Sequence, residues 1–110
     1  MNTLKNKVEL AGHVGKAPEI LTMTTGKKLA KFSLATRETF TNSKGEKVTS
    51  TQWHNIVAWG KMAELVEQQV PKGREIEITG KLSSRSYEDK NGIKKYVTEV
   101  VCNELLLPGN

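Results

Sequence analysis

Apolar and polar residues alternate along most of this 110-residue chain, and the alternation limits its fold more than any other feature. In the stretch KVELAGHV the apolar residues Val8, Leu10 and Val14 occupy even positions, and charged or polar residues lie between them. A period of two is typical of a β-strand, because successive side chains of a strand point to opposite faces. The sequence therefore predicts a first strand over residues 7–14.

The same period returns in four later segments that are separated by turn residues. We expect strands over residues 27–36, 51–60, 74–87 and 93–102. A short extended piece, EILTMT, precedes the second of the five strands. Residues 38–50 are polar and contain SKG, so we interpret them as a long, charged hairpin loop. The stretch DKNG at 89–92 indicates a turn between the last two strands.

One segment departs from the alternation. In GKMAELVEQQV, residues 60–70, the apolar residues recur at helical spacing, and Pro71 and Gly73 lie just beyond as a stop. Five strands with a single helix after the third follow the order expected of an OB-fold. We therefore predict an all-β protein, a five-stranded OB-fold barrel (Greek key) with one short helix between strands 3 and 4. A small sandwich or another small barrel would fit the same strands.

Length and composition indicate one globular domain. The chain is 36% hydrophobic and 26% charged, which suits one small core and not a disordered chain. No apolar run approaches the roughly 20 residues that span a bilayer, and the start, MNTLKNKVEL, lacks the apolar stretch of a secretion signal. The single cysteine, Cys102, cannot form an internal disulfide, which fits a reducing compartment. We expect a cytoplasmic protein with no membrane partner.

Both tryptophans lie six positions apart in TQWHNIVAWG, residues 51–60. An even separation places Trp53 and Trp59 on the same face of a strand, with Asn55 and Val57 between them. Two interpretations are open, because parity alone does not identify the face that points into the barrel. The tryptophans either belong to the core, which is their commonest use, or form an exposed surface on which other rings stack.

Cations interleave with the aromatic residues: Arg37 and Lys44 flank Phe40, Arg85 precedes Tyr87, and Lys61 follows Trp59. The net charge of +5 and the pI near 9.4 also suit a polyanionic partner, although charge alone fits an ordinary solvated surface equally well. Aromatic side chains that stack on bases, with Lys and Arg along the phosphates, bind unpaired strands without reading their sequence. The pattern therefore predicts a preference for single strands over duplexes, whose base faces are hidden.

From about Asn6 to Asn103 the chain resembles the bacterial single-stranded DNA-binding protein family. The resemblance rests on NKVELAGHVGKAPE, FSLAT, WHNIVAWGKMAE, the KG pair at 72 and 73, ITGKL, and YVTEVV. It implies an OB-fold that coats and protects single-stranded DNA during DNA replication, recombination and repair. It also implies a homotetramer that is cytoplasmic and associated with the nucleoid.

The resemblance further implies roles for particular residues. Base stacking is expected at Phe40, Trp53, Trp59 and Tyr87. Phosphate contacts are expected at Lys7, Lys61, Lys72 and Arg85, and the interleaving adds Arg37. His54, on the strand face opposite the tryptophans, matches a histidine at a subunit contact. Phe40 and Tyr87 stand where well-studied members carry tryptophan, so their smaller rings should stack with less area.

The end of the chain differs from the usual pattern of that family. Its members commonly continue into a flexible tail that closes in acidic residues and Pro-Phe and recruits replication and repair enzymes. This sequence ends in LLLPGN, with no acidic residue after Glu104. We expect a single domain over residues 1–110, with its core at about 5–103 and no acidic tail. We accordingly do not expect this chain to bind the tail-dependent partners.

Catalytic and metal-binding patterns are poorly represented. The glycines of GHVG make neither a dinucleotide-binding motif nor a P-loop, and no serine lies in a GxSxG context. Neither histidine has a cysteine or acidic partner at metal-ligand spacing, and Cys102 is not part of a CxxC motif. We therefore expect a protein that is not an enzyme and that uses neither a cofactor nor a metal.

Two other functions fit the same residues. An OB-fold similar to the primosomal replication-restart proteins would work chiefly by contacting other replication proteins, as a dimer with weak affinity for single strands. An RNA-binding OB-fold is the second alternative, because base stacking hardly senses the 2′-hydroxyl group. Oligomeric state and affinity for single strands distinguish the first alternative from the main hypothesis.

Overall fold

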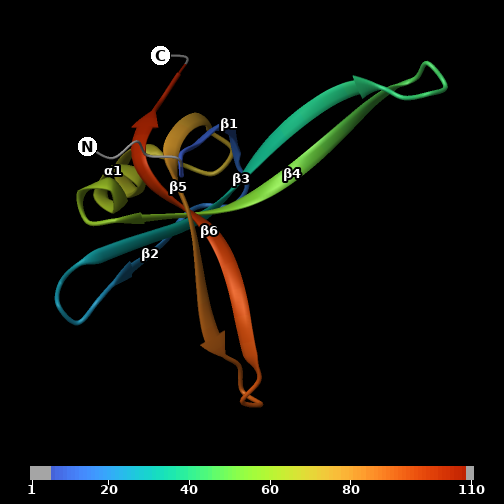
Figure 1. Ribbon diagram of the computed structural model, residues 1–110. Coiled ribbons are helices and arrows are strands. Elements are labelled where there is room, and N and C mark those ends of the chain that lie inside the picture. The colour runs from blue at the N-terminus through green and yellow to red at the C-terminus, as the bar shows by residue number, and fades with distance from the viewer. Residues whose placement is uncertain (1–5, 109–110) are drawn as a thin grey trace, which may run out of the picture.

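A computed structural model describes residues 6–108, which form six strands and one helix (Figure 1). The elements are β1 (Val8–Val14), β2 (Glu19–Thr22), β3 (Lys28–Thr41), β4 (Lys47–Trp59), α1 (Lys61–Gln69), β5 (Glu75–Glu88) and β6 (Lys94–Leu106). The predicted start of the core at residue 5 lies outside the described residues. In the described part of the chain, α1 is far too short to cross a membrane, and no longer apolar helix is present.

Five of the strands close into a barrel in the order β1-β5-β6-β4-β3. The barrel closes where β1 pairs with β3, His13 opposite Ala35 and Val14 opposite Leu34. All neighbouring strands are antiparallel except β4 and β6, which run parallel and pair only at Ile56–Val100 and Val57–Val101. This closed barrel, with its helix between the third and fourth barrel strands, confirms the predicted OB-fold.

The core lies inside the barrel and contains the even-numbered side chains of the inward strand faces. Leu34, Ile56 and Ile76 are among its fully buried members. At the closure Gly12 leaves no room for a side chain, because a Cβ there would overlap the carbonyl oxygen of Ala35 on β3. The absence of a side chain at this position therefore allows the two strands to approach and the barrel to close.

Helix α1 packs against the barrel through Ala63 and Val66, both fully buried. It begins after Gly60, whose φ of 60° lies in the left-handed region that glycine adopts without strain. Lys28 Nζ at the start of β3 donates a 2.7 Å hydrogen bond to the Glu67 carboxylate of the helix. This contact raises the pKa of Lys28, mainly through the hydrogen bond and then through the charge of Glu67.

Two β-hairpins extend well beyond the barrel (Figure 1). The first arm is residues 37–51 of β3 and β4, and the second arm is residues 84–98 of β5 and β6. Their turns are built alike. Asn42 Oδ1 accepts hydrogen bonds from the N–H groups of Lys44 and Glu46, and Asp89 Oδ1 accepts from those of Asn91 and Ile93. Each turn also contains a glycine at positive φ.

The first arm corrects the predicted hairpin loop at residues 38–50. Only residues 42–46 form the turn, and the others continue β3 and β4 in register, as with Glu38 opposite Ser50. The arm has solvent on both faces, so its strands carry polar residues at both parities and lose the alternation that marks a strand at the core. Similarly, the short piece EILTMT contributes a sixth strand, β2, which pairs with β3 outside the barrel.

Candidate nucleic-acid interface

Strand β4 carries both tryptophans on its outward face. Ile56 and Ala58 point into the core and are buried, whereas Trp53 and Trp59 are 62% and 41% exposed. The structure therefore decides between the two interpretations of TQWHNIVAWG in favour of an exposed surface. Val57 lies between the two tryptophans on this face but is buried. The exposed rings of Trp53 and Trp59 are therefore separated by a covered residue.

Small residues support the ring of Trp53. A Cβ at Gly15 would lie 2.6 Å from Trp53 Cζ3, so the indole lies directly against the glycine backbone. Ala35 is opposite Trp53 across the β3–β4 pair and is buried although it is on the outward face. Packing of one part of the ring in this way holds it in place and leaves the rest accessible to solvent.

Trp59 is flanked by an apolar residue and a cation. Leu29 is its partner across β3 and β4, and is buried on the outward face. Lys27 Nζ lies 5.3 Å from the centroid of the Trp59 ring, a cation–π geometry. Lys61, the first residue of α1, is exposed two positions after Trp59. Lys27 thus lies over this ring, and Lys61 follows it closely in the chain.

The second arm brings Tyr87 and Arg85 to its outward face. Tyr87 is 47% exposed. Arg85 Nε donates a 3.0 Å hydrogen bond to Glu99 Oε1 on the neighbouring strand. This hydrogen bond and the charge of Glu99 raise the pKa of Arg85, which keeps the guanidinium charged. Arg85 thus already has a carboxylate partner within the protein.

Phe40 and His54 lie on the other face of the β3–β4 ribbon. Phe40 pairs with Val48, five positions along β3 from Ala35, so its side chain points away from the face that carries Trp53. Phe40 is 49% exposed. His54 is half-buried, and its Nε2 lies 2.9 Å from the Thr36 hydroxyl, within hydrogen-bond distance. The structure therefore does not bring all four predicted aromatic residues onto one face.

The remaining predicted cations are exposed but dispersed. Arg37 is opposite Thr51 on the same face of the first arm as Trp53. Lys7 precedes β1, whereas Lys72 precedes Gly73, whose N–H donates to the carbonyl of Val14 at the end of β1. Lys7 and Lys72 therefore stand at opposite ends of that strand.

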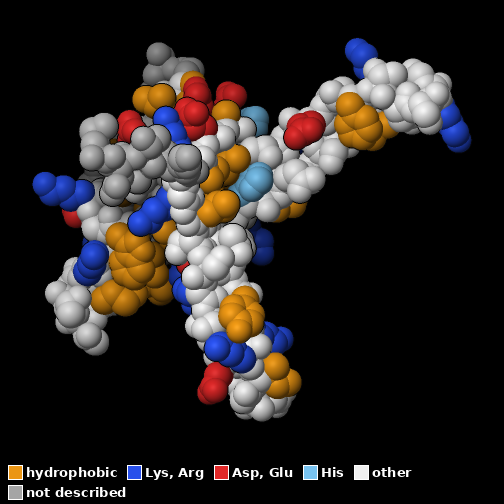
Figure 2. All heavy atoms as spheres, viewed as in Figure 1, with side chains coloured by type: hydrophobic (Ala, Val, Ile, Leu, Met, Phe, Trp, Pro, Cys, Tyr) orange, Lys and Arg blue, Asp and Glu red, His pale blue; other side chains and the backbone are white. Residues whose placement is uncertain are grey.

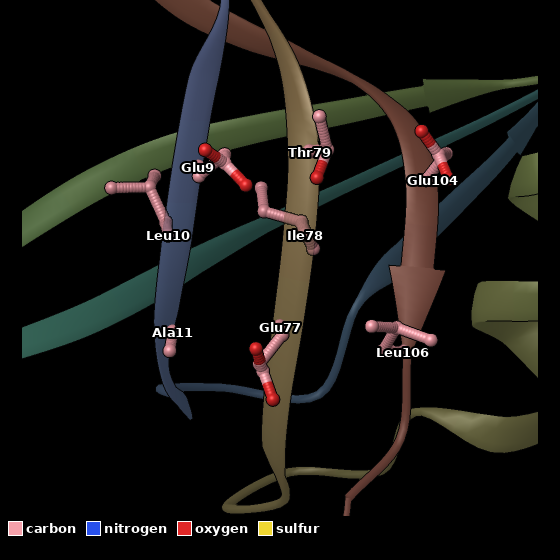
Figure 3. A pocket seen from close by; sticks show the side chains of 8 residues that line it. All are labelled: Glu9, Leu10, Ala11, Glu77, Ile78, Thr79, Glu104 and Leu106. Carbon is pink, nitrogen blue, oxygen red and sulfur yellow. The ribbon is translucent and has the colours of Figure 1, made fainter.

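Charge is unevenly distributed over the surface. In Figure 2, Lys and Arg side chains occupy the ends of both arms and the lower body, and Asp and Glu gather near the upper end of the body. Figure 3 shows an acidic groove on the barrel wall, where Glu9, Glu77 and Glu104 project from β1, β5 and β6. No residue of β3 or β4 lines this groove. Its three carboxylates would repel phosphates, so a nucleic acid would avoid this part of the wall.

Metal and thiol chemistry find little support in the described residues. Within residues 6–108, no group of three or more His, Cys, Asp or Glu side chains is placed to hold a metal ion. Burial raises the pKa of the Cys102 thiol to about 11. The thiol therefore stays protonated and unreactive at neutral pH.

Sequence reasoning missed several residues around the tryptophans. Lys27 was not singled out, although it follows Gly26 in a turn that the sequence indicates. Lys16 and Lys31 line a recess together with Glu99, and Lys16 also lines the neighbouring hollow that contains Trp53. The alternation of β3 already placed Lys31 and Ser33 on the face opposite Phe32, which could have indicated them. The ion pair of Glu99 with Arg85 required the register of β5 and β6, which no local pattern contains.

Comparisons with known proteins agree on one family. The model of the "Single-strand binding protein family" matches residues 5–107. Single-stranded DNA-binding protein 1 of Chlorobaculum tepidum is 46% identical over 105 residues, 94% of this chain and 65% of the relative. The single-stranded DNA-binding protein of Neisseria meningitidis is 38% identical over 104 residues, 94% of this chain and 60% of the relative. This chain thus spans somewhat under two thirds of the length of these relatives.

A solved structure shares the fold over nearly the whole chain. It is described as "Plasmodium falciparum SSB complex with ssDNA", and it superposes with a TM-score of 0.88 at 32% sequence identity. The match covers 99% of this chain and 100% of the other.

The outward position of Trp53 gives a prediction about stability. Trp53→Ala should lower the free energy of unfolding by about 1 kcal/mol or less, because most of the ring is exposed. Ile56→Ala, three residues away on the buried face, should cost about 2–5 kcal/mol. Urea unfolding of both variants and the parent checks this. Equal destabilisation by the two substitutions would show that Trp53 belongs to the core.

Proposed function

Because the chain belongs to the single-strand binding protein family, we propose that it binds single-stranded DNA without reading its sequence. By coating single strands it would protect them during DNA replication, recombination and repair. Binding requires no catalysis, and we assign the chain no enzymatic role and no cofactor. As a DNA-coating protein it would act in the cytoplasm, in association with the nucleoid.

The observation that carries this proposal is the exposure of Trp53 and Trp59 on one outward face of β4. Six residues of strand separate their Cα atoms by about 20 Å, which leaves room for several nucleotides between the two rings. An unpaired base offers a flat face to an indole, whereas a duplex does not, so the surface favours single strands. Tyr87 would extend the stack onto the second arm, and Phe40 would contact a strand that passes around the first arm.

Cations would hold the phosphates on either side of the stacked bases. We assign this role to the exposed Lys7, Arg37, Lys61, Lys72 and Arg85. Lys27 joins them because its ammonium group already lies over Trp59 and a bound strand would pass it. Arg85 keeps its bond to Glu99 through Nε, and the terminal guanidinium nitrogens are then available to a phosphate.

Self-assembly is the second part of the proposal. We propose a homotetramer, in which His54 contributes to a subunit contact. Its support is the position of His54, which lies on the face of the β3–β4 ribbon opposite Trp53 and pairs with Leu34 at the barrel, whereas Phe40 lies farther out on the first arm. An assembly that used this face would leave the tryptophans open to DNA.

The stacking role predicts a loss of binding without a loss of fold. Trp53→Ala should weaken binding to oligo-dT by about 1–3 kcal/mol, or about fivefold to a hundredfold, and oligo-dT should quench the tryptophan fluorescence of the parent. Tyr96→Ala is the matched control, because Tyr96 is 73% exposed but pairs with Ser86, on the arm face opposite Tyr87. Equal affinity of the parent for oligo-dT and for a hairpin stem would contradict the proposal.

Phosphate contacts predict a salt dependence. If roughly four of these six cations engage phosphates in each subunit, log K against log[salt] should have a slope near −3, and Lys61→Ala should reduce its magnitude by about 0.7. Lys28→Ala provides the control, because Lys28 is already bonded to Glu67. Titrations with oligo-dT from low to physiological salt give the slopes. An affinity indifferent to salt would exclude these cations from the phosphates.

Oligomeric state separates the proposal from its main alternative. Light scattering should give four times the mass of the chain, and adding oligo-dT of increasing length should report the number of nucleotides bound. A dimer with weak affinity for oligo-dT would instead favour a protein that chiefly contacts other replication proteins. RNA oligonucleotides of the same length, tested in parallel, address the RNA-binding alternative.

A further inference from the structure

A recess lies at the fork where the two arms separate. Strands β4 and β6 pair at Ile56–Val100 and then diverge, so Asn55 and Glu99 stand at the same level on either side of the fork. Ser33 is opposite Asn55 on β3. All three line the recess, whose walls include Val57 and Val97. Three polar side chains of different chemistry thus meet in a hollow with partly apolar walls.

The recess adjoins Trp53. A neighbouring hollow is lined by Gly15, Lys16, Ser33 and Trp53, and it shares Lys16 and Ser33 with the recess. A base stacked on Trp53 would therefore have its neighbour in the strand close to Asn55. Lys16 and Lys31 also line the recess, where they could hold phosphates, and Glu19 is opposite Lys31.

The polar groups of the recess have unused hydrogen-bonding capacity. Among residues 6–108, neither the Ser33 hydroxyl nor the Asn55 amide makes a side-chain hydrogen bond. Glu99 accepts from Arg85 through Oε1, which leaves its second carboxylate oxygen available. The Glu99 side chain is only 12% exposed, so its carboxylate oxygens are accessible over a small area only.

The chemistry of these groups suits the edge of a base better than a phosphate. A carboxylate repels phosphate but accepts hydrogen bonds from the exocyclic amino group of cytosine. Thymine and uracil present a carbonyl oxygen at the same position, which a carboxylate repels. Asn55 can donate and accept at once, and therefore can complete the contact with the neighbouring ring nitrogen or carbonyl of cytosine.

We propose that this recess is a single-base subsite in which Glu99 and Asn55 select cytosine over thymine or uracil. This inference rests on the proposed function, because it adds discrimination at one nucleotide to a strand otherwise held by stacking and phosphate contacts. Arg85 acts as a positioning residue, since its hydrogen bond orients the Glu99 carboxylate.

The test compares oligo-dT strands that carry one dC or one dU, with the substitution moved along the strand. Deoxyuridine lacks the thymine methyl group, so dC and dU differ only in the hydrogen-bonding edge. For the parent chain, dC at one position should bind about fivefold more tightly than dU at that position. Competition against labelled oligo-dT measures the ratio.

Two variants locate the effect in the recess. Glu99→Gln should bring the dC-to-dU ratio close to one, because an amide can either accept or donate. Asn55→Ala should lower the ratio and is the second variant if the first folds poorly. Glu77→Gln is the control: it removes the same charge in the acidic groove and should leave the ratio unchanged. The ratio is taken within each variant, so a change in total affinity cancels.

The outcomes separate this inference from the function on which it rests. Tight binding of oligo-dT with equal affinity for dC and dU at every position would overturn the subsite alone. A preference that survives both Glu99→Gln and Asn55→Ala would also overturn it. Failure of the parent to bind oligo-dT at all would overturn the proposed function together with the subsite.

Discussion

Strands β1 and β3 approach so closely at the barrel closure that Gly12, facing the Ala35 carbonyl, has no room for a side chain. The pairing made possible there turns an open sheet into a barrel, and closure gives each of the five barrel strands an inside and an outside. Because Ile56 points into the barrel, the odd-numbered residues of β4 must point outward. The exposure of Trp53 on β4 therefore depends on the backbone contact between β1 and β3, on the side of β3 that faces away from β4.

The alternation was sufficient to predict the five barrel strands, because each strand has one face against the core. The helical spacing of residues 60–70 added the single helix, and the order of these elements gave the fold class. It failed at residues 38–50, where the first arm has solvent on both faces and the sequence carries no period to detect. It also could not orient TQWHNIVAWG, since Val57 and Ile56 are both apolar and both buried. Which face of this strand points outward depends on how the whole sheet curves, and pairing between distant parts of the chain determines that curvature.

The candidate site likewise has one part that the sequence predicted and another that it did not. The interleaving of cations with aromatic residues predicted the kind of site, and the resemblance to a family supplied the roles of particular residues. Trp53 and Trp59 of β4 occupy the exposed face that stacking would require. The relation of Phe40 to Trp53 depended on the register of β3 against β4, which places them on opposite faces of the first arm. The bond between Arg85 and Glu99 depended on the register of β5 against β6. Such cross-strand partners are fixed by pairing over many residues, so single-residue patterns carried no sign of them.

A base-selective subsite is compatible with binding that ignores sequence. A preference of about fivefold at one nucleotide is worth about 1 kcal/mol, which is small beside the stacking of several bases and the release of several counterions. On a long natural strand, cytosine occurs every few nucleotides, and a bound protein can shift by that distance to place one in the recess. The preference would therefore set the local register of the protein on DNA without restricting which strands it coats. The proposed subsite would also account for the carboxylate of Glu99 among the proposed DNA-binding cations, because it would direct a base, and not a phosphate, into the fork between the arms.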